Sequence, residues 1–193
     1  MQDHTSTAKL ALRDQLLAGR KRLGLAVVGD RARATAEHLL TSAEVRRAAS
    51  VAVYASVATE PGTGPLLEGL RAAGKRVILP LLQGDNDLDW AAYDDPAGLR
   101  SARRGLLEPT GPALGADAIA TADVVLVPGL AVGPEGMRLG RGGGSYDRAL
   151  ARVPVGTFTC VLLNSEELLD HVPADGHDRR VTAAATELGI TRF

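Results

Sequence analysis

The apolar positions of this chain fall into short continuous runs that alternate with amphipathic or capped segments. The runs lie at residues 51–54, 77–80, 88–93, 124–127, 158–163 and 181–184. Helices are predicted between and before them, at residues 5–18, 30–40, 65–73, 116–121, 146–153 and 166–170. Asp30 is a candidate helix cap and Gly74 a candidate stop. Because strands that are apolar throughout are buried on both faces, the pattern predicts an α/β fold, a mostly parallel sheet covered by helices on both faces.

The length of 193 residues suits one domain. We expect a single α/β domain over residues 1–193, with residues 1–45 as an N-terminal helical segment packed on it. Hydrophobic residues make up 45% of the chain and aromatic residues only 3%, so the core must be built from Leu, Val and Ala. A net charge of −1 lacks the basic excess of nucleic-acid-binding proteins, and we expect no nucleic acid partner.

Long apolar segments are missing from the sequence. No run approaches the ~20 residues of a membrane span, and the N-terminus has no signal-peptide pattern, so we expect no membrane association. The lone cysteine, Cys160, cannot form an internal disulfide, which favours a reducing, cytoplasmic location. Cys160 is expected to be a small buried side chain and Trp90 a packing residue. We expect a monomer.

Residues 138–147 carry the densest candidate chemistry. This stretch, Arg-Leu-Gly-Arg-Gly-Gly-Gly-Ser-Tyr-Asp, follows the apolar run at 124–127. Glycines let backbone N–H groups approach a ligand, and the predicted helix at 146–153 would add N-terminal donors. Arg138 and Arg141 offer forked donors for phosphate oxygens, and Asp147 suits a Mg²⁺ that bridges phosphate to protein. The stretch predicts a polyphosphate loop rather than a flexible turn, which would be weakly charged.

Two common phosphate loops are excluded. A Walker A loop needs a lysine, and no lysine follows Lys75. A dinucleotide fingerprint, G-x-G-x-x-G, needs a third glycine at the position that Ser145 occupies in residues 140–145. The loop is therefore of a less common kind.

Three further segments carry candidate groups. Lys9 and Arg13 lie four apart on one helix face, either as a solvated pair or as cations that close over phosphates. Glu60 follows the strand at 51–54, either as an exposed turn residue or as an acceptor for a heterocycle's N–H groups. Asp178 becomes a metal ligand only if it comes near Asp147.

Taken in order, these segments resemble the 5-formyltetrahydrofolate cyclo-ligase family. The matching motifs are Lys9-x-x-x-Arg13, Tyr54, Glu60-x-x-Thr63, Gly105-Leu106-Leu107-Glu108-Pro109, Val127-Pro128-Gly129-Leu130-Ala131, Gly136-x-Arg138-Leu139-Gly140-Arg141-Gly142-Gly143-Gly144-x-Tyr146-Asp147 and His177-Asp178. The resemblance implies a NagB/RpiA/CoA-transferase-like fold. It also implies a ligase of folate one-carbon metabolism, which converts 5-formyltetrahydrofolate and ATP to 5,10-methenyltetrahydrofolate, ADP and phosphate.

The same resemblance assigns roles by position. ATP would be bound by Lys9, Arg13, Arg138, Leu139, Gly140, Arg141, Gly142, Gly143, Gly144, Ser145 and Tyr146. The folate substrate would be bound by Ala55, Glu60, Arg141, Gly142, Gly143, Gly144 and Ser145. Mg²⁺ would be held by Asp147 and Asp178. Catalysis would depend on Arg138, Arg141 and Tyr146.

Three positions depart from the family's pattern. Ser145 stands where the family often has a first tyrosine, Gly133 where it usually has Asp, and Thr182 where it often has a second acid. They favour an alternative, a non-catalytic nucleotide- or folate-binding protein of the same fold. A third hypothesis, a sugar-phosphate isomerase or acyl-CoA transferase relative, suits Asp147 less well, because a metal ligand beside the loop fits ATP better than a monophosphate.

Overall fold

The computed structural model describes residues 2–193, with side chains from residue 5 onward. The α-helices are α1 (Gln2–Arg20), α2 (Leu25–Thr41), α3 (Ala43–Arg47), α4 (Gly64–Ala72) and α5 (Ser145–Leu150). The strands are β1 (Ser50–Ala52), β2 (Arg76–Leu82), β3 (Leu88–Ala92), β4 (Leu99–Ser101), β5 (Leu107–Pro109), β6 (Val124–Pro128), β7 (Ala131–Val132), β8 (Arg138–Leu139), β9 (Phe158–Leu162), β10 (Ala183–Thr186) and β11 (Gly189–Arg192). Short 3-10 helices are η1 (Pro96–Gly98), η2 (Arg103–Gly105), η3 (Ala116–Thr121) and η4 (Ser165–Glu167).

Within residues 2–193 the central sheet has seven strands in the order β11-β10-β9-β6-β1-β2-β3. The four inner pairings, from β10 to β2, are parallel. The two edge strands, β3 and β11, run antiparallel to their neighbours because each follows its partner through a short turn. The predicted mostly parallel sheet is confirmed, with antiparallel strands at its edges.

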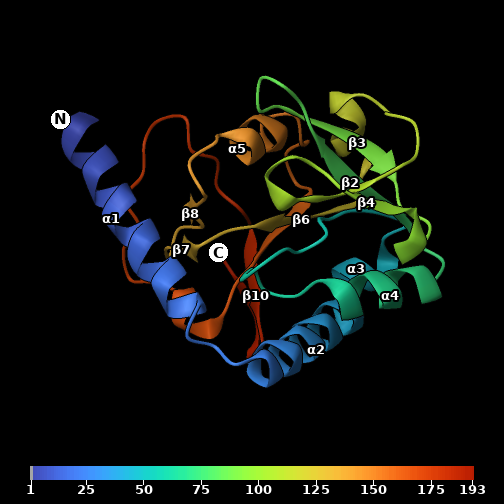
Figure 1. Cartoon of the computed structure of the whole chain (residues 1–193), viewed down its shortest axis with the longest axis horizontal. Coiled ribbons are helices and arrows are strands. Elements are labelled where there is room, and N and C mark those ends of the chain that lie inside the picture. The colour runs from blue at the N-terminus through green and yellow to red at the C-terminus, as the bar shows by residue number, and fades with distance from the viewer. Residues whose placement is uncertain (1) are drawn as a thin grey trace.

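Helices cover both faces of this sheet, as predicted (Figure 1). Successive side chains of a strand point to opposite faces. Val51 and Val53 therefore pack in the cluster formed with α2, α3 and α4, whereas Ala52 packs with α5 and η3. Trp90 and Cys160 are buried in these clusters, as the sequence predicted. The core is built from Leu, Val and Ala with few aromatic rings.

Some predicted elements are wrong in their bounds or type. α2 begins at Leu25 rather than Asp30, because Gly24 caps it and Asp30 lies inside the helix paired with Arg33. The helix predicted at residues 166–170 is the single 3-10 turn η4. The chain also continues past the run at 181–184 into β11, which closes the sheet edge.

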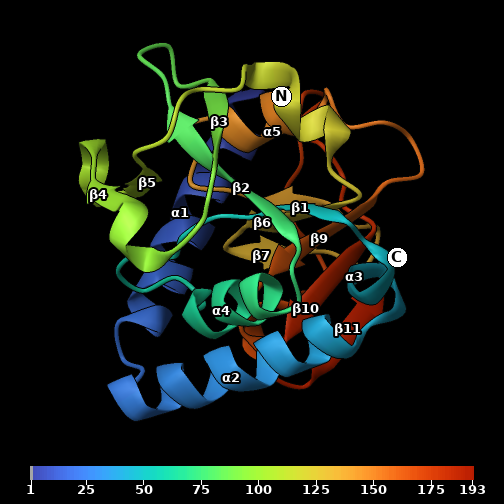
Figure 2. The same ribbon diagram turned by 90° about the vertical axis from the view of Figure 1, so that its right-hand side faces the viewer.

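Residues 96–115, where the sequence pattern predicts no helix or strand, contain a small hairpin, β4–β5. Its strands pair antiparallel, and the carboxylate of Glu108 in β5 accepts a hydrogen bond from the backbone N–H of Leu82 at 2.8 Å. Figure 2 shows the hairpin beside the end of β2. Short polar strands of this kind give no apolar run, so the sequence pattern missed them.

The order of the strands creates a crevice. From β1 the chain moves to β2 on one side, and it later returns to place β6 on the other side of β1. The loops after two neighbouring parallel strands then diverge, which opens a ligand-binding crevice at the carboxyl ends of the strands. Residues after β1 and after β6 therefore border the same space.

A buried ion pair fixes the end of α1 to this crevice. Arg20 and Glu167 are 3% and 2% exposed, and two hydrogen bonds of 2.6 and 2.7 Å join them. Nη2 of Arg20 also donates to the carbonyl of Gly129 at 2.7 Å, directly after β6. Earlier in α1, the apolar side chains of Leu12, Leu16 and Leu17 pack against β7 and β8. None of the helices described for residues 2–193 is long and apolar enough to cross a membrane.

We predict that Glu167→Ala destabilises the fold far more than Glu166→Ala. The first change leaves the Arg20 guanidinium buried without a counter-charge, which costs about 3–5 kcal/mol. Glu166 pairs with Arg31 at the surface, where its loss costs less than about 1 kcal/mol. Urea unfolding of the two variants measures the difference. Equal losses of unfolding free energy would mean that the buried pair is not an anchor.

Candidate functional site

A cavity of about 520 Å³ lies at the carboxyl ends of β1 and β6. It brings together every candidate residue of the sequence analysis: Lys9, Arg13, Ala55, Glu60, Arg138, Leu139, Gly140, Arg141, Gly142, Gly143, Gly144, Ser145, Tyr146, Asp147 and Asp178. Segments that are far apart in the sequence thus meet at one site. The individual roles assigned to these residues stay predictions.

The glycine loop, residues 140–144, runs from β8 to α5 along one wall of the cavity. Gly142 and Gly144 have φ of 94° and 68°, in the left-handed region that favours glycine. At Gly140 a Cβ would lie 2.7 Å from Nη1 of Arg138, closer than real side chains approach. The glycines therefore permit both the turn and its close packing on an arginine.

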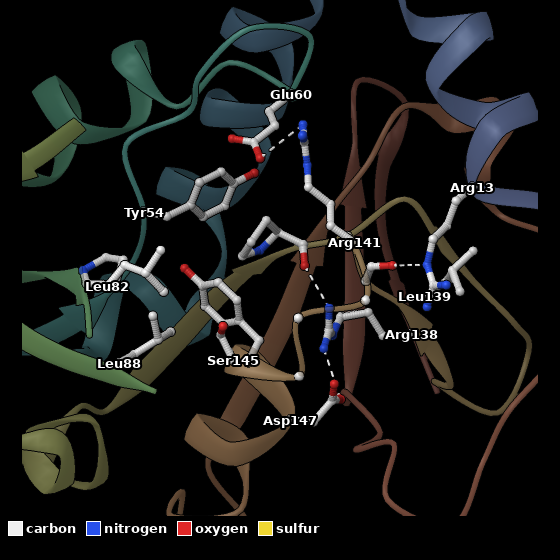
Figure 3. Close-up of a pocket in the computed structure, with 18 of the residues that line it drawn as sticks. Arg13, Tyr54, Glu60, Leu82, Leu88, Arg138, Leu139, Arg141, Ser145 and Asp147 are labelled. Carbon is white, nitrogen blue, oxygen red and sulfur yellow. Dashed lines mark hydrogen bonds and ion pairs between the residues drawn. The ribbon is translucent and has the colours of Figure 1, made fainter. Parts of the chain in front are cut away.

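Arg138 is 5% exposed and connects two elements of the site. Its Nη1 donates to the carbonyl of Pro128 at the end of β6, at 3.1 Å. Its Nη2 donates to Oδ1 of Asp147 in α5, at 3.0 Å (Figure 3). The forked guanidinium makes the two bonds from separate nitrogens, which fixes its orientation between the two elements.

α1 brings two more cations to the loop. Nε of Arg13 donates to the carbonyl of Gly140 at 2.9 Å. Nζ of Lys9 lies 2.7 Å from a carboxylate oxygen of Asp175 and 2.5 Å from one of Asp178. Burial works against the charge of Lys9, but the two carboxylates outweigh it and raise its pKa. The helix face predicted from the spacing of Lys9 and Arg13 thus faces the cavity rather than solvent.

The two candidate metal ligands, Asp147 and Asp178, each form an ion pair with a cationic side chain. Asp147 accepts from Arg138 and from the backbone N–H of Arg179 at 3.2 Å. Burial opposes ionisation of Asp178, but the hydrogen bonds from Lys9 and from the Asp175 backbone N–H prevail and lower its pKa. In the part of the chain that the structure describes, no three His, Cys, Asp or Glu side chains form a metal-binding group.

Glu60 lies on the opposite side of the cavity, in the loop after β1 (Figure 3). Its carboxylate accepts from the backbone N–H of Val57 at 3.0 Å, and Nη2 of Arg141 lies 3.5 Å from Oε1. Burial raises the pKa of Glu60, although the Val57 N–H and Arg141 act against the shift. Arg141 thus reaches from the glycine loop toward Glu60.

Two tyrosines stand close to Glu60. Burial, with a smaller contribution from the Glu60 charge, raises the pKa of both Tyr54 and Tyr146. Their phenols therefore stay neutral and can still donate a hydrogen bond. The hydroxyl of Tyr54 has no hydrogen-bond partner within the described residues.

The Glu60 side of the cavity also carries several apolar side chains. Its wall includes Pro80, Leu82, Leu88, Leu106 and Leu107. The sequence analysis gave none of these a role, because single leucines in strands look like core residues. The only available signal was the matching motif at residues 105–109, which carries two of the leucines. The cavity thus has a glycine- and cation-rich end and an apolar end, and Arg141 lies between them.

Comparisons with known proteins agree with this site. The model of the 5-formyltetrahydrofolate cyclo-ligase family matches residues 5–187. A 5-formyltetrahydrofolate cyclo-ligase of Mycolicibacterium smegmatis is 42% identical over 142 residues, which are 71% of this chain and 73% of that protein.

Two solved structures share the fold. The NMR structure of Aquifex aeolicus 5,10-methenyltetrahydrofolate synthetase has a TM-score of 0.78 and 28% identity, and the match covers 95% of this chain and 92% of that one. A 5,10-methenyltetrahydrofolate synthetase of Mycoplasma pneumoniae has a TM-score of 0.74 over 93% of this chain and 98% of that one, at 19% identity, and supports the fold alone. The chain therefore belongs to the 5-formyltetrahydrofolate cyclo-ligase family and is an enzyme of that family.

Proposed function

We propose that the chain closes the ring of 5-formyltetrahydrofolate to 5,10-methenyltetrahydrofolate at the expense of ATP, with release of ADP and phosphate. One observation carries this proposal. A single cavity holds a glycine loop with buried cations at one end and an apolar wall with a carboxylate at the other. A nucleotide's phosphates and a folate's ring system need these two environments side by side.

The cation-rich end suits a triphosphate. Arg13 and Arg138 lie against the loop. Lys9 lies one helical turn before Arg13 in α1 and also lines the cavity. Permanent charge and forked donors favour phosphate oxygens, and backbone N–H groups of a glycine loop add further donors. We therefore assign ATP binding to Lys9, Arg13 and residues 138–146.

The same end fits Mg²⁺. This ion needs one or two carboxylates and completes its shell with waters and substrate phosphates. Asp147 and Asp178 offer such oxygens, and each already binds a cationic side chain. A magnesium–triphosphate complex carries both signs of charge. Its Mg²⁺ would take the place of the cations beside Asp147 and Asp178, and its phosphates would take the place of the acids beside Arg138 and Lys9. When bound, Mg²⁺ would neutralise charge on the transferring phosphoryl group.

The apolar end suits the folate. The Glu60 carboxylate can accept hydrogen bonds from the N–H groups of the pterin ring, and Ala55 borders the same wall. The side chain of Arg141 lies near Glu60, while its backbone is part of the glycine loop. Residues 141–145 would thus touch both ligands, where the formyl oxygen must meet the γ-phosphate.

The proposed chemistry needs no protein nucleophile. The formyl oxygen attacks the γ-phosphorus of ATP, and ADP leaves. The second folate nitrogen attacks the activated formyl carbon and loses its proton, and the carbon–oxygen bond breaks as phosphate departs. Protein side chains supply position and charge, which dominate phosphoryl transfer. Arg138, Arg141 and the neutral phenol of Tyr146 line the meeting point and are assigned to it.

The alternative, a binding protein without turnover, has limited support. Of the three departing positions, only Ser145 lines the cavity; Thr182 instead joins β9 to β10 through hydrogen bonds with Thr159. Incubation with Mg²⁺-ATP and 5-formyltetrahydrofolate separates the two functions by the ultraviolet absorbance of the methenyl product. We expect product that depends on ATP. Binding of both ligands without product would favour the alternative.

Asp147→Asn should abolish most turnover while the protein stays folded. The amide keeps an oxygen acceptor for Arg138 but loses the charge that would hold Mg²⁺, whose charge stabilisation is worth several kcal/mol, or on the order of a hundredfold in rate. Asp117→Asn is the matched control, since that side chain is 92% exposed and outside the cavity. Steady-state turnover over a magnesium titration checks the prediction, and unchanged turnover would remove the metal role.

Arg138→Lys should weaken Mg²⁺-ATP binding. Lysine keeps the charge but has one donor nitrogen in place of the separate Nη1 and Nη2 that bond the Pro128 carbonyl and Asp147, so it loses the forked geometry for a phosphate oxygen. The loss of a charge-assisted hydrogen bond, about 1.5–3 kcal/mol, corresponds to a roughly ten- to hundredfold higher Kd. Arg152→Lys, which alters a similar forked pair with Asp87 away from the cavity, serves as control. Titration calorimetry that finds equal Kd values for the wild type and Arg138→Lys would contradict the assignment.

Glu60→Gln should change the pH dependence of stability. Because the folded-state pKa of Glu60 lies above its value in the unfolded chain, its protonated form stabilises the fold, and this contribution is lost as pH rises from about 4.5 through the raised pKa. The amide removes that loss, so the variant should gain stability relative to wild type toward neutral pH while its folate affinity falls. Urea unfolding at several pH values measures the shift, with Glu68→Gln, at an exposed position of α4, as control. Parallel pH profiles of wild type and Glu60→Gln would refute it.

A further inference from the structure

Building on the proposed function, we infer that Arg104 binds the glutamate carboxylate of the folate substrate and so sets the preference for a glutamylated folate. Arg104 lies in the turn of the β4–β5 hairpin and lines the apolar end of the cavity.

The hairpin is anchored firmly over the cavity. Glu108 is 7% exposed and accepts the backbone N–H of Leu82, which joins β5 to the end of β2. Leu106 and Leu107, between Arg104 and this anchor, line the cavity. The hairpin is therefore one wall of the site, and its turn lies at the rim.

The backbone at Arg104 is unusual. Its φ of 60° and ψ of 21° lie in the left-handed region, and Gly105 follows with φ of 71°. A left-handed conformation is unfavourable for arginine, which has a Cβ, and such residues persist where the surroundings hold them. Together the two residues turn the chain sharply between β4 and β5.

Within residues 5–193, some cations that line the cavity are paired with carboxylates, whereas Arg104 and Arg13 are not, and Arg13 instead donates to the Gly140 carbonyl. Lys9, Arg138 and Arg141 each have a carboxylate nearby. Nη2 of Arg104 donates only to the side-chain oxygen of Asn86 at 2.8 Å, and no carboxylate pairs with it within the described residues. Its charge and its remaining donors can therefore serve an anionic ligand group.

The groups that line the cavity match the parts of the proposed substrate. Glu60 would take the pterin, the leucines of β2, β3 and the hairpin offer an apolar surface for the aminobenzoyl ring, and Arg104 lies two residues before Leu106 in the same hairpin. In 5-formyltetrahydrofolate the glutamate is attached to the aminobenzoyl ring. A carboxylate that leaves the apolar wall thus meets a forked cation, the geometry that favours Arg–carboxylate recognition.

The experiment compares two substrates, 5-formyltetrahydrofolate and 5-formyltetrahydropteroate, which lacks the glutamate. Arg104→Ala should raise KM for the glutamylated compound roughly fivefold to tenfold. It should leave kcat, KM for ATP and KM for the pteroate unchanged. Because the site is at the surface, the fivefold to tenfold effect should shrink at high salt.

Two control variants separate charge from structure. Asn86→Gly removes the side-chain partner of Arg104 and tolerates the φ of 66° found at residue 86, and it should leave KM nearly unchanged. Arg71→Ala removes an exposed arginine of α4 away from the cavity. The inference is overturned if Arg104→Ala leaves both KM values unchanged or raises both equally, or if Asn86→Gly reproduces its effect.

Failure of the proposed function gives a different result. If wild-type protein converts neither compound with Mg²⁺-ATP, the proposed reaction is wrong. Calorimetric titration of the same two compounds then still tests Arg104. The inference is supported if the wild type binds the glutamylated compound more tightly than the pteroate and Arg104→Ala loses this difference. Equal affinities of the wild type for the two compounds refute it.

Discussion

The turn after β6 depends on two buried arginines that hold neighbouring backbone carbonyls. Arg20 donates to the carbonyl of Gly129, and Arg138 donates to that of Pro128. Buried carbonyls need such donors, and each arginine is in turn neutralised by a carboxylate from another element, η4 or α5. The end of α1, η4, β8 and α5 are thereby fixed around one point at the carboxyl end of the central strand. The cavity takes its shape from this arrangement, because the glycine loop begins directly after β8 and ends at α5.

The same interactions set the electrostatics of the site. Its buried charges occur as pairs, Arg138 with Asp147 and Lys9 with Asp178, so an anion or a cation that binds alone at either pair would lie beside a like charge. Binding a triphosphate alone would leave the acids beside negative oxygens, and binding a metal alone would leave it beside the cations. A magnesium–nucleotide complex satisfies both sets. This complementarity is the reason for proposing ATP rather than a simple phosphate ester as the ligand.

Sequence patterns predicted the sheet better than its surroundings. The run at residues 124–127 is apolar on both faces and could only be a central strand, and the charged glycine loop after it indicated a ligand site. Asp30 looked like a helix cap but lies inside α2, because a capping residue and an exposed acid within a surface helix look alike in sequence. The hairpin inside residues 96–115 was not predicted, since its short polar strands depend on contacts with β2. That Arg13 reaches the glycine loop follows from the packing of α1 on β7 and β8, which no local pattern reveals.

The proposal that the cavity brings the formyl oxygen to the γ-phosphate is tested most directly by following that oxygen. Substrate labelled with ¹⁸O in the formyl group should be converted with Mg²⁺-ATP, and the released phosphate should be analysed by mass spectrometry. The account predicts that the label appears in the phosphate, because the formyl oxygen itself becomes phosphorylated and departs with it. Label found in water, with unlabelled phosphate, would contradict the account.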